Sequence, residues 1–294
     1  MHARKSSGVH RPEPRTTGPC RLTCLPLLYN IPLLCGFGGR MQESKLKLAG
    51  ENIRVQQAGS GPPILFLHGA GGASWTPLHE QLSRDWRVIV PEHPGFGRSV
   101  LPDWMMSVGD LAFFYLDVLQ ELDLRDVHLV GHSLGGWTAA EIAIRSTQRL
   151  ASLTLMAPAG IAVPDAPFGD IFLWSPEENA RHQFYHLHHV EERLRQPIDL
   201  DVLLQNRAAT ARLAWSPRQH NPQLPHWLHR IDVPTLLLWG AEDEFAPVAG
   251  GRRFEREIPG SVLVVVEGAG HFVFDEQPQR CSDEITAFLG DRVG

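Results

Sequence analysis

Cysteine is scarce in this 294-residue chain: only four are present, and three of them fall within the first 35 residues. The fourth, Cys281, has no partner for a disulfide in the remaining chain, which favours a reducing compartment. We therefore expect a cytoplasmic protein rather than a secreted one. Because Cys281 lies in a polar helical stretch with no turn motif around it, we interpret it as a bystander and not as a nucleophile.

Long runs of one residue class are also missing. The formal net charge is -6 and is spread without long runs. A phosphate-binding protein needs a basic face, so we expect no nucleic-acid partner. The apolar stretch Leu22–Phe37 is interrupted by Pro26 and Pro32, and it is too short for a membrane span, so we expect no stable membrane insertion.

The first forty residues differ from the rest of the chain. Their basic start precedes the apolar stretch, which is the order found in a signal peptide. The two prolines interrupt the helix that such a peptide needs, and no clear small-x-small cleavage site follows. We interpret residues 1–40 as a disordered extension, as a start codon placed too early would produce.

From residue 45 onward, short continuous apolar segments alternate with segments of helical periodicity, as expected of buried strands and amphipathic helices. A hairpin over 45–57, turning at Gly50-Glu51-Asn52, precedes strands predicted over 63–68, 87–91, 127–130, 150–156, 235–239 and 262–266. Helices are predicted over 77–84, 108–122, 135–146, 246–258 and 276–289. This alternation predicts an α/β fold with a mostly parallel eight-stranded sheet flanked by helices.

One interval breaks the alternation. Residues 157–231 contain no convincing strand and show helical patches near 176–189 and 199–213. We predict a core formed by residues 41–157 and 231–294, with residues 158–230 inserted as a helical cap over the sheet edge.

Gly131-His132-Ser133-Leu134-Gly135-Gly136 follows a predicted strand and opens a predicted helix. This context is typical of a nucleophile elbow, in which a sharp turn exposes the serine hydroxyl and requires very small neighbours two positions away. The helix N-terminus also favours developing negative charge. A glycine-rich turn of a nucleotide-binding fold is the alternative interpretation.

The loop His68-Gly69-Ala70-Gly71-Gly72 follows the first buried strand. Because glycines let a backbone N–H approach a ligand closely, we expect the N–H groups of Ala70 and Leu134 to form an oxyanion hole. A plain flexible loop is the alternative.

Asp243 and His271 each follow a predicted strand, in the segments Trp239-Gly240-Ala241-Glu242-Asp243 and Gly268-Ala269-Gly270-His271. The chain order serine, acid, histidine is that of one known type of catalytic triad. We therefore predict Ser133 as nucleophile, His271 as base and Asp243 as the acid that orients it. Glu242 and Glu244 flank Asp243 and compete with it for this role.

These segments resemble the α/β-hydrolase superfamily over roughly residues 44–290, and the turn His93-Pro94-Gly95-Phe96-Gly97-Arg98-Ser99 is similar to one in that family. The family usually has Asp where this chain has Glu92. The chain looks like the group with a helical cap, which includes meta-cleavage product hydrolases, small esterases and haloperoxidase-like enzymes. Epoxide hydrolases and haloalkane dehalogenases use Asp at the elbow, so Ser133 counts against them.

The resemblance implies a carboxylesterase-like reaction on a small, largely apolar substrate: Ser133 attacks an ester-like or activated carbonyl, and water releases the acyl-enzyme. It implies no cofactor and no metal. Small molecules are then the expected partners, and a homodimer is compatible with the sequence.

The predicted cap is rich in aromatic residues, and we expect Phe168 and Trp174, together with Phe272 beside the catalytic histidine, to contact substrate. Ordinary packing is the alternative for most of them. Four histidines, His182, His186, His188 and His189, suggest a metal site, but no cysteine or spaced acid completes it. Arg181 and Arg207 are candidates for binding a carboxylate, with solvated surface positions as the alternative.

Three other functions stay open. A carbon–carbon bond hydrolase of the same family uses the same serine, but it usually has Asn or Ser before the nucleophile and Trp after the histidine, where this chain has His132 and Phe272 to Phe274. A non-catalytic small-molecule receptor can keep the whole triad. A cofactor-free perhydrolase needs only a different acyl acceptor.

Overall fold

A computed structural model describes residues 40–290, so the predicted extension over residues 1–40 lies, apart from Arg40, outside the described residues. Eight strands form one sheet in the order β1-β2-β4-β3-β5-β6-β7-β8. The pairs β1·β2 and β2·β4 are antiparallel, and the others are parallel. The strands are β1 (Gln42–Leu48), β2 (Glu51–Ala58), β3 (Pro63–Leu67), β4 (Arg87–Pro91), β5 (Val127–His132), β6 (Leu150–Met156), β7 (Thr235–Gly240) and β8 (Val262–Val266).

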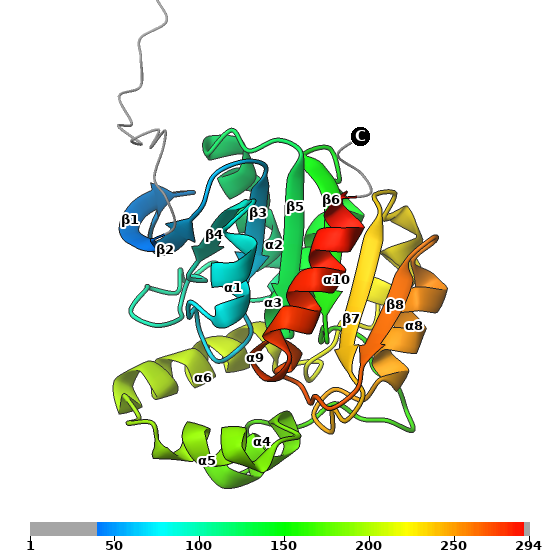
Figure 1. Ribbon diagram of the computed structural model, residues 1–294. Helices are drawn as coiled ribbons and strands as arrows, with labels where there is room; N and C mark the ends of the chain where they lie inside the picture. The colour runs from blue at the N-terminus through cyan, green and yellow to red at the C-terminus, as the bar shows by residue number, and fades with distance from the viewer. Residues whose placement is uncertain (1–39, 291–294) are drawn as a thin grey trace, which may run out of the picture. The chain divides into compact units, whose positions relative to one another are not determined.

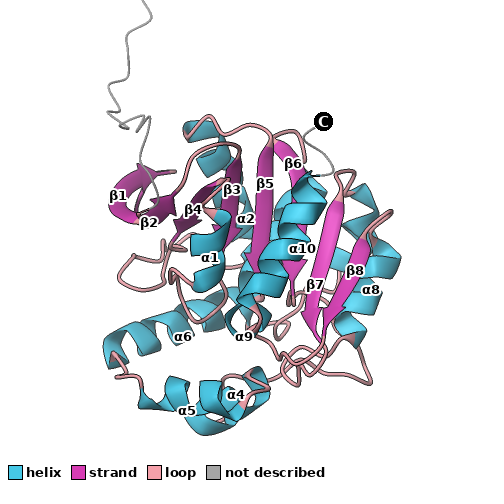
Figure 2. Ribbon diagram, viewed as in Figure 1, coloured by secondary structure: helices cyan, strands magenta, loops and turns pink. Residues whose placement is uncertain are grey.

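Two layers of helices cover this sheet, which confirms the predicted fold class (Figure 1, Figure 2). The first layer is α1 (Pro77–Leu82) and α10 (Pro278–Gly290), and the second is α2 (Val108–Glu121), α3 (Leu134–Arg145) and α8 (Ala249–Glu257). Each layer packs on its own cluster of buried apolar side chains. Every residue of β5 and of β7 is buried, as expected of central parallel strands covered on both faces.

Several boundaries differ from the prediction. The hairpin turns at Ala49 and Gly50, both with positive φ, and the second strand begins at Glu51, two residues earlier than predicted. The helix predicted over 276–289 is instead the short α9 (Val273–Glu276) followed by α10, which begins at Pro278, a residue that is favourable in the first turn of a helix.

The segment 157–234, between β6 and β7, is here called the insertion. Its helices are α4 (Pro176–Gln183), α5 (Leu187–Arg195), α6 (Leu200–Ala214), α7 (Leu224–Trp227) and a 3₁₀ turn (Leu228–Arg230). The helical character predicted near residues 176–189 is divided between two helices, because extended backbone at Phe184 and His186 separates α4 from α5. A parallel bridge between Gly160 and His220 is the one strand-like pairing within the described insertion.

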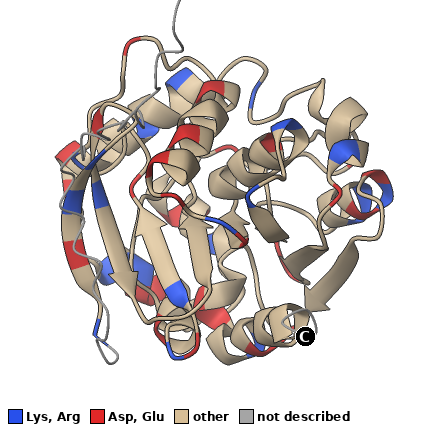
Figure 3. Cartoon of the chain, turned by 90° about the horizontal axis from the view of Figure 1, so that it is seen from above, with Lys and Arg blue, Asp and Glu red and all other residues tan. Residues whose placement is uncertain are grey.

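Charged residues of both signs are interspersed along the elements of the chain, which Figure 3 shows from above. Within residues 40–290, none of the helices combines the length and the apolarity that crossing a membrane requires.

Candidate active site

Ser133 lies between β5 and α3 in a strained turn. Its backbone angles, φ 54° and ψ -116°, are rarely adopted by a residue with a side chain. The turn requires glycine at two positions. A Cβ at Gly131 would collide with the carbonyl of Gly135, and a Cβ at Gly135 would collide with the carbonyl of Leu67. The glycine spacing read from the sequence therefore has a direct steric cause.

Two backbone N–H groups next to the serine have no partner among the described residues. They belong to Ala70, in the loop after β3, and to Leu134, the first residue of α3. Both residues line a small cavity together with Ser133. Free N–H groups beside a serine hydroxyl can stabilise an oxyanion formed on an attacked carbonyl.

Buried histidines hold the loop that contains Ala70. His68 donates from Nδ1 to the Gly69 carbonyl at 2.7 Å and accepts the His93 backbone N–H at Nε2 at 2.9 Å. His93 donates from Nε2 to the His68 carbonyl at 2.8 Å and accepts the Tyr115 hydroxyl at Nδ1 at 2.6 Å. Burial lowers the pKa of His68 to about 4 and the pKa of His93 well below its usual range, so both rings are neutral near pH 7.

His271 is fixed by Asp243. Its Nδ1 donates to Asp243 Oδ2 at 2.9 Å, and both side chains are almost fully buried. The other carboxylate oxygen of Asp243 accepts the backbone N–H groups of Phe245 and Ala246 at 2.9 and 2.6 Å. Because Nδ1 carries the hydrogen, Nε2 of His271 is the nitrogen that can accept a proton.

The acids flanking Asp243 have other partners. Glu242 accepts the backbone N–H of Ala269 at 2.9 Å, which braces the loop before the histidine. Glu244 is exposed and contacts His182 Nδ1 at 2.9 Å. The structure thus brings Asp243, and neither neighbour, to the ring of His271.

His132, which precedes the serine, is a site residue that sequence reasoning did not identify. Its Nε2 donates to the backbone carbonyl of His271 at 3.0 Å, and the two ring centroids are 4.7 Å apart. Burial, followed by the nearby His271, lowers the pKa of His132 well below its usual range. A neutral ring therefore joins the elbow to the histidine loop.

Glu276, on α9, is a second residue that the sequence did not reveal. It is 9% exposed, and its carboxylate accepts three backbone N–H groups, from Gly270 at 2.7 Å, Tyr185 at 3.2 Å and His186 at 2.8 Å. Gly270 precedes His271, and the other two residues lie in the break between α4 and α5. One carboxylate therefore joins the histidine loop to the insertion.

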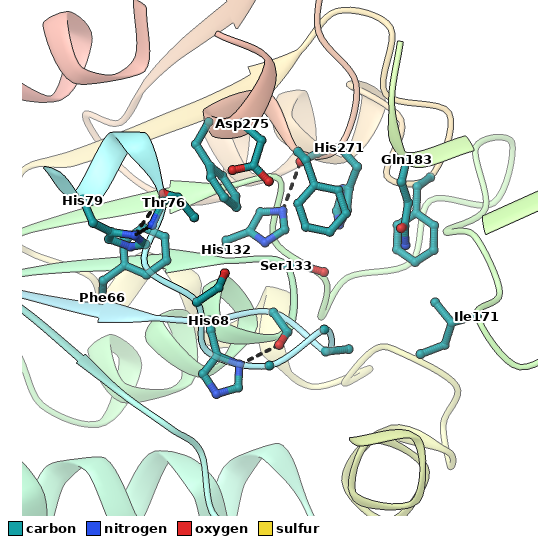
Figure 4. A pocket seen from close by; sticks show the side chains of 18 residues that line it. Phe66, His68, Thr76, His79, His132, Ser133, Ile171, Gln183, His271 and Asp275 are labelled. Atoms are coloured by element: carbon teal, nitrogen blue, oxygen red, sulfur yellow. Dashed lines mark hydrogen bonds between the residues drawn. The ribbon is translucent and has the colours of Figure 1, made fainter. Parts of the chain in front are cut away.

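The Ser133 hydroxyl and the His271 ring open into the same cavity of about 70 Å³. Figure 4 shows Ile171 and Gln183 of the insertion on one side of Ser133, with Thr76 and Phe66 on the other. A second cavity of about 20 Å³ touches Ser133 from the side of α3. Within the described chain, Ser133 Oγ makes no hydrogen bond to His271, a contact that often tightens only when substrate binds.

The three predicted substrate-contacting residues are not equivalent. Phe272 lines the larger cavity and stacks on Phe184 at 4.9 Å. Phe168 lines the smaller cavity and packs edge-to-face on Phe245 at 4.8 Å. Trp174 lines neither of them, because it stacks on His182 at 4.3 Å.

Other predicted groups lie away from the cavities. The described residues contain no cluster of three or more His, Cys, Asp or Glu side chains suited to a metal ion. Arg181 pairs with Glu177 on the surface of α4, and neither Arg181 nor Arg207 lines the two cavities. Cys281 is buried, and burial raises the pKa of its thiol to about 12, so it is a poor nucleophile.

Glu92 supports the turn after β4. It is 3% exposed, and its carboxylate accepts hydrogen bonds from the Arg54 guanidinium at 2.9 Å and the Ser99 hydroxyl at 2.8 Å. A Cβ at Gly97 would collide with this carboxylate. The longer acid therefore fits because a glycine faces it.

Known proteins resemble this chain in sequence and in fold. A model of the alpha/beta hydrolase family matches residues 64–284. A 2-hydroxy-6-oxo-6-phenylhexa-2,4-dienoate hydrolase of Comamonas testosteroni is 27% identical over 269 residues, covering 82% of this chain and 92% of the relative. A serine hydrolase involved in carbazole degradation has a TM-score of 0.74 at 23% identity, covering 86% of this chain and 100% of its own. An esterase from Exiguobacterium antarcticum has a TM-score of 0.71 at 22% identity, covering 85% and 100%. At these identities the two structures establish a shared fold.

Proposed function

We infer that this chain, which belongs to the alpha/beta hydrolase family, cleaves an ester-like or activated carbonyl bond through an acyl-enzyme on Ser133. The observation that carries the proposal is the His271–Asp243 pair, which leaves Nε2 of the histidine free beside the cavity that Ser133 enters. A serine with an adjacent, oriented base is the arrangement needed for nucleophilic catalysis.

In the proposed reaction, His271 Nε2 accepts the hydroxyl proton as Ser133 Oγ attacks the carbonyl carbon. The N–H groups of Ala70 and Leu134 bind the resulting oxyanion, and Asp243 stabilises the protonated imidazole. The histidine returns the proton to the leaving group, and a water molecule, activated by the same histidine, hydrolyses the acyl-enzyme. Backbone N–H groups hold the Asp243 carboxylate, Asp243 holds the His271 ring, and the Ser133 N–H donates to the Met156 carbonyl, which supports catalysis without large rearrangement.

The cavity walls support a small, largely apolar substrate. Phe66, Ile171, Phe245, Phe272 and Phe274 line the larger cavity beside the reactive groups. The smaller cavity adds Trp137 and Phe168. The aromatic and aliphatic parts of these walls favour an apolar group of the substrate.

A panel of p-nitrophenyl esters of increasing acyl length tests the proposal. We expect wild type to hydrolyse the short esters and Ser133→Ala to lose at least about 10⁴-fold in kcat, because triad members act as a unit. The matched control is Ser146→Ala, a serine at the far end of α3, which should leave the rates unchanged. Full activity of Ser133→Ala contradicts the assignment, and tight binding without turnover in wild type supports the receptor function instead.

A carbon–carbon bond hydrolase is the second candidate, because relatives with 25–28% identity are named as hydrolases of 2-hydroxy-6-oxo-dienoates. Such a reaction would use the same serine and histidine on a vinylogous diketone. A dienoate of that kind assayed beside the ester panel separates the two candidates. Turnover of the dienoate at a higher kcat/KM than every ester would favour carbon–carbon cleavage.

A further inference from the structure

Asp275, on α9 next to Glu276, is an acidic residue that lines the larger cavity. The proposed reaction does not use its carboxylate. Its carboxylate makes no hydrogen bond or ion pair with another described residue, whereas Glu276 accepts three backbone N–H groups. Figure 4 shows Asp275 next to His132 in the view, with Ser133 beyond the His132 ring. A mostly buried carboxylate without a hydrogen-bond partner in the described chain therefore lines the same cavity as Ser133 and His271.

The charges around Asp275 do not neutralise it. Burial, followed by the neighbouring Glu276, raises the pKa of Asp275 to about 6, so the carboxyl is ionised above that pH. From the exposed helix α5, Arg193 acts to lower this pKa and Glu192 to raise it. Neither of these two surface residues lines the cavity.

The larger cavity also has no Lys or Arg among the described residues that line it, and histidines are its only basic side chains. Burial lowers the pKa of His68 to about 4 and of His79 to about 3, and the pKa of His132 lies well below its usual range. These rings are neutral near pH 7, so they leave the charge of Asp275 uncompensated.

His79 adds a free donor at the end of the cavity beyond His132. Its Nδ1 accepts the backbone N–H of Thr76 at 3.0 Å, so the ring hydrogen resides on Nε2. That nitrogen is buried and has no partner among the described residues. A buried group without a partner is costly, and a hydrogen bond to a bound ligand would remove the cost.

We propose that this cavity selects substrates by charge: Asp275 binds a hydroxyl, amide N–H or ammonium group of the substrate and disfavours a carboxylate. The inference rests on the proposed function only in calling the bound ligand a substrate. Because the dienoates of the second candidate function carry a carboxylate, the inference counts against that candidate. An anion placed near Asp275 would have to be desolvated beside a like charge, with no Lys or Arg in the wall to offset it.

Binding to Ser133→Ala protein tests the charge selection without any turnover. The probes are benzylammonium, benzyl alcohol and benzoate, which share one aromatic ring, titrated by calorimetry at pH 8. We expect benzoate to bind at least about tenfold more weakly than benzylammonium, with benzyl alcohol between them. In the double variant Ser133→Ala, Asp275→Asn, the ratio should fall to within about twofold.

The control is Asp283→Asn, which removes an exposed carboxylate from α10 and should leave the ratio unchanged. A melting curve for each variant shows that it is folded. Benzoate binding as tightly as benzylammonium, an unchanged ratio in Asp275→Asn, or no binding of benzylammonium would each overturn the inference.

A second measurement connects this selection to catalysis. Wild type is assayed with phenyl acetates that carry a 4-aminomethyl, 4-hydroxymethyl or 4-carboxy group, and each kcat/KM is divided by the rate of alkaline hydrolysis of that ester. The 4-carboxy ester should be the poorest substrate by about tenfold, and Asp275→Asn should remove that difference. If no ester is hydrolysed but the binding order holds, the proposed function fails and the charge selection stands. If the esters are hydrolysed without discrimination, the selection fails and the proposed function stands.

Discussion

The loops at the carboxyl ends of the strands and the insertion beside them are built differently. β5 and β7, which lead to the serine and to the acid, are buried along their whole length. In α5 of the insertion, by contrast, only Val190 is buried. Several large apolar side chains of the insertion are exposed, among them Leu173, Leu187, Leu200, Leu204, Trp215 and Trp227. The proposed catalytic groups therefore follow fully buried strands, whereas much of the insertion is held by fewer buried contacts.

Individual polar side chains join the two regions. Glu276 of the core accepts N–H groups from the break between α4 and α5, and Asn206 of α6 bonds to the Gly71 carbonyl and the Gly97 N–H at 3.0 and 2.7 Å. The proposed catalytic groups and the insertion are therefore held in place by different side chains. A mutation can weaken the contacts of one region without those of the other.

The largest effect after loss of the serine should come from Asp243→Asn, in the loop after β7. An amide cannot stabilise the protonated ring and can hold the wrong tautomer, so we expect kcat to fall by about 10³- to 10⁴-fold. Steady-state kinetics on a short p-nitrophenyl ester measure this. The paired variant Glu244→Gln, on the exposed neighbour, should stay within about twofold. A similar loss in both variants would remove the distinction between the buried acid and its neighbours.

Acid should weaken the core more than the insertion, because the core holds the neutral buried histidines. The pKa of His68 is about 4 and of His79 about 3, while an unfolded histidine has a pKa near 6.5. Between these values the unfolded chain binds more protons than the folded one, so the free energy of unfolding falls as pH decreases below about 6.5. At pH 5, each of these two histidines lowers the free energy of unfolding by about 2 kcal/mol relative to neutral pH.

Asp275 acts in the opposite direction, because its pKa of about 6 in the folded protein is above its unfolded value. It therefore raises the free energy of unfolding by about 1 kcal/mol at pH 5. Urea unfolding from pH 8 to pH 5 measures the net slope. His79→Phe should flatten it, whereas His188→Phe, on exposed α5, should not. An equal slope in wild type and His79→Phe would contradict the assignment of a neutral buried ring.

Glu276→Gln tests the link between the regions. The amide keeps one acceptor oxygen but loses the charge, so part of the set of three backbone N–H groups is left without a partner. We expect this to lower the free energy of unfolding by about 1–3 kcal/mol. Because Gly270 and the α4–α5 break both relax, we expect a lower kcat and a higher KM together. Glu267→Gln, an exposed acid nearby, is the control and should change neither.

Asn206→Ala should have the smallest effect. It removes the two hydrogen bonds from α6 to the loops around Gly71 and Gly97, at about 1–2 kcal/mol in urea unfolding. We expect KM to rise several-fold with kcat within about twofold, because the serine and histidine loops keep their own bonds. Leu204→Ala, exposed on the same helix, is the matched control. A large loss of kcat in Asn206→Ala would mean that the insertion supports the chemistry itself.

The same contrast explains what the sequence could predict. Buried parallel strands are continuous apolar runs, and the elbow requires glycines at fixed spacing, so both are visible locally. The break at Phe184–His186 is not, because an exposed helix imposes little periodicity on its residues. Glu276 was missed for another reason: its partners are backbone N–H groups up to 91 positions away, which leave no mark on residue type.

Chain order gives the Glu276 carboxylate a role in the timing of synthesis. The elbow serine and the whole insertion leave the ribosome before Asp243, His271 and Glu276, because these three lie in the last part of the chain. A nascent chain therefore carries the serine without its base, and its insertion lacks the acid that will attach it to the histidine loop. The elements β7 through α10, which follow the insertion in the chain, both attach it through Glu276 and complete the proposed triad, so the nascent protein gains the proposed activity only after they are made.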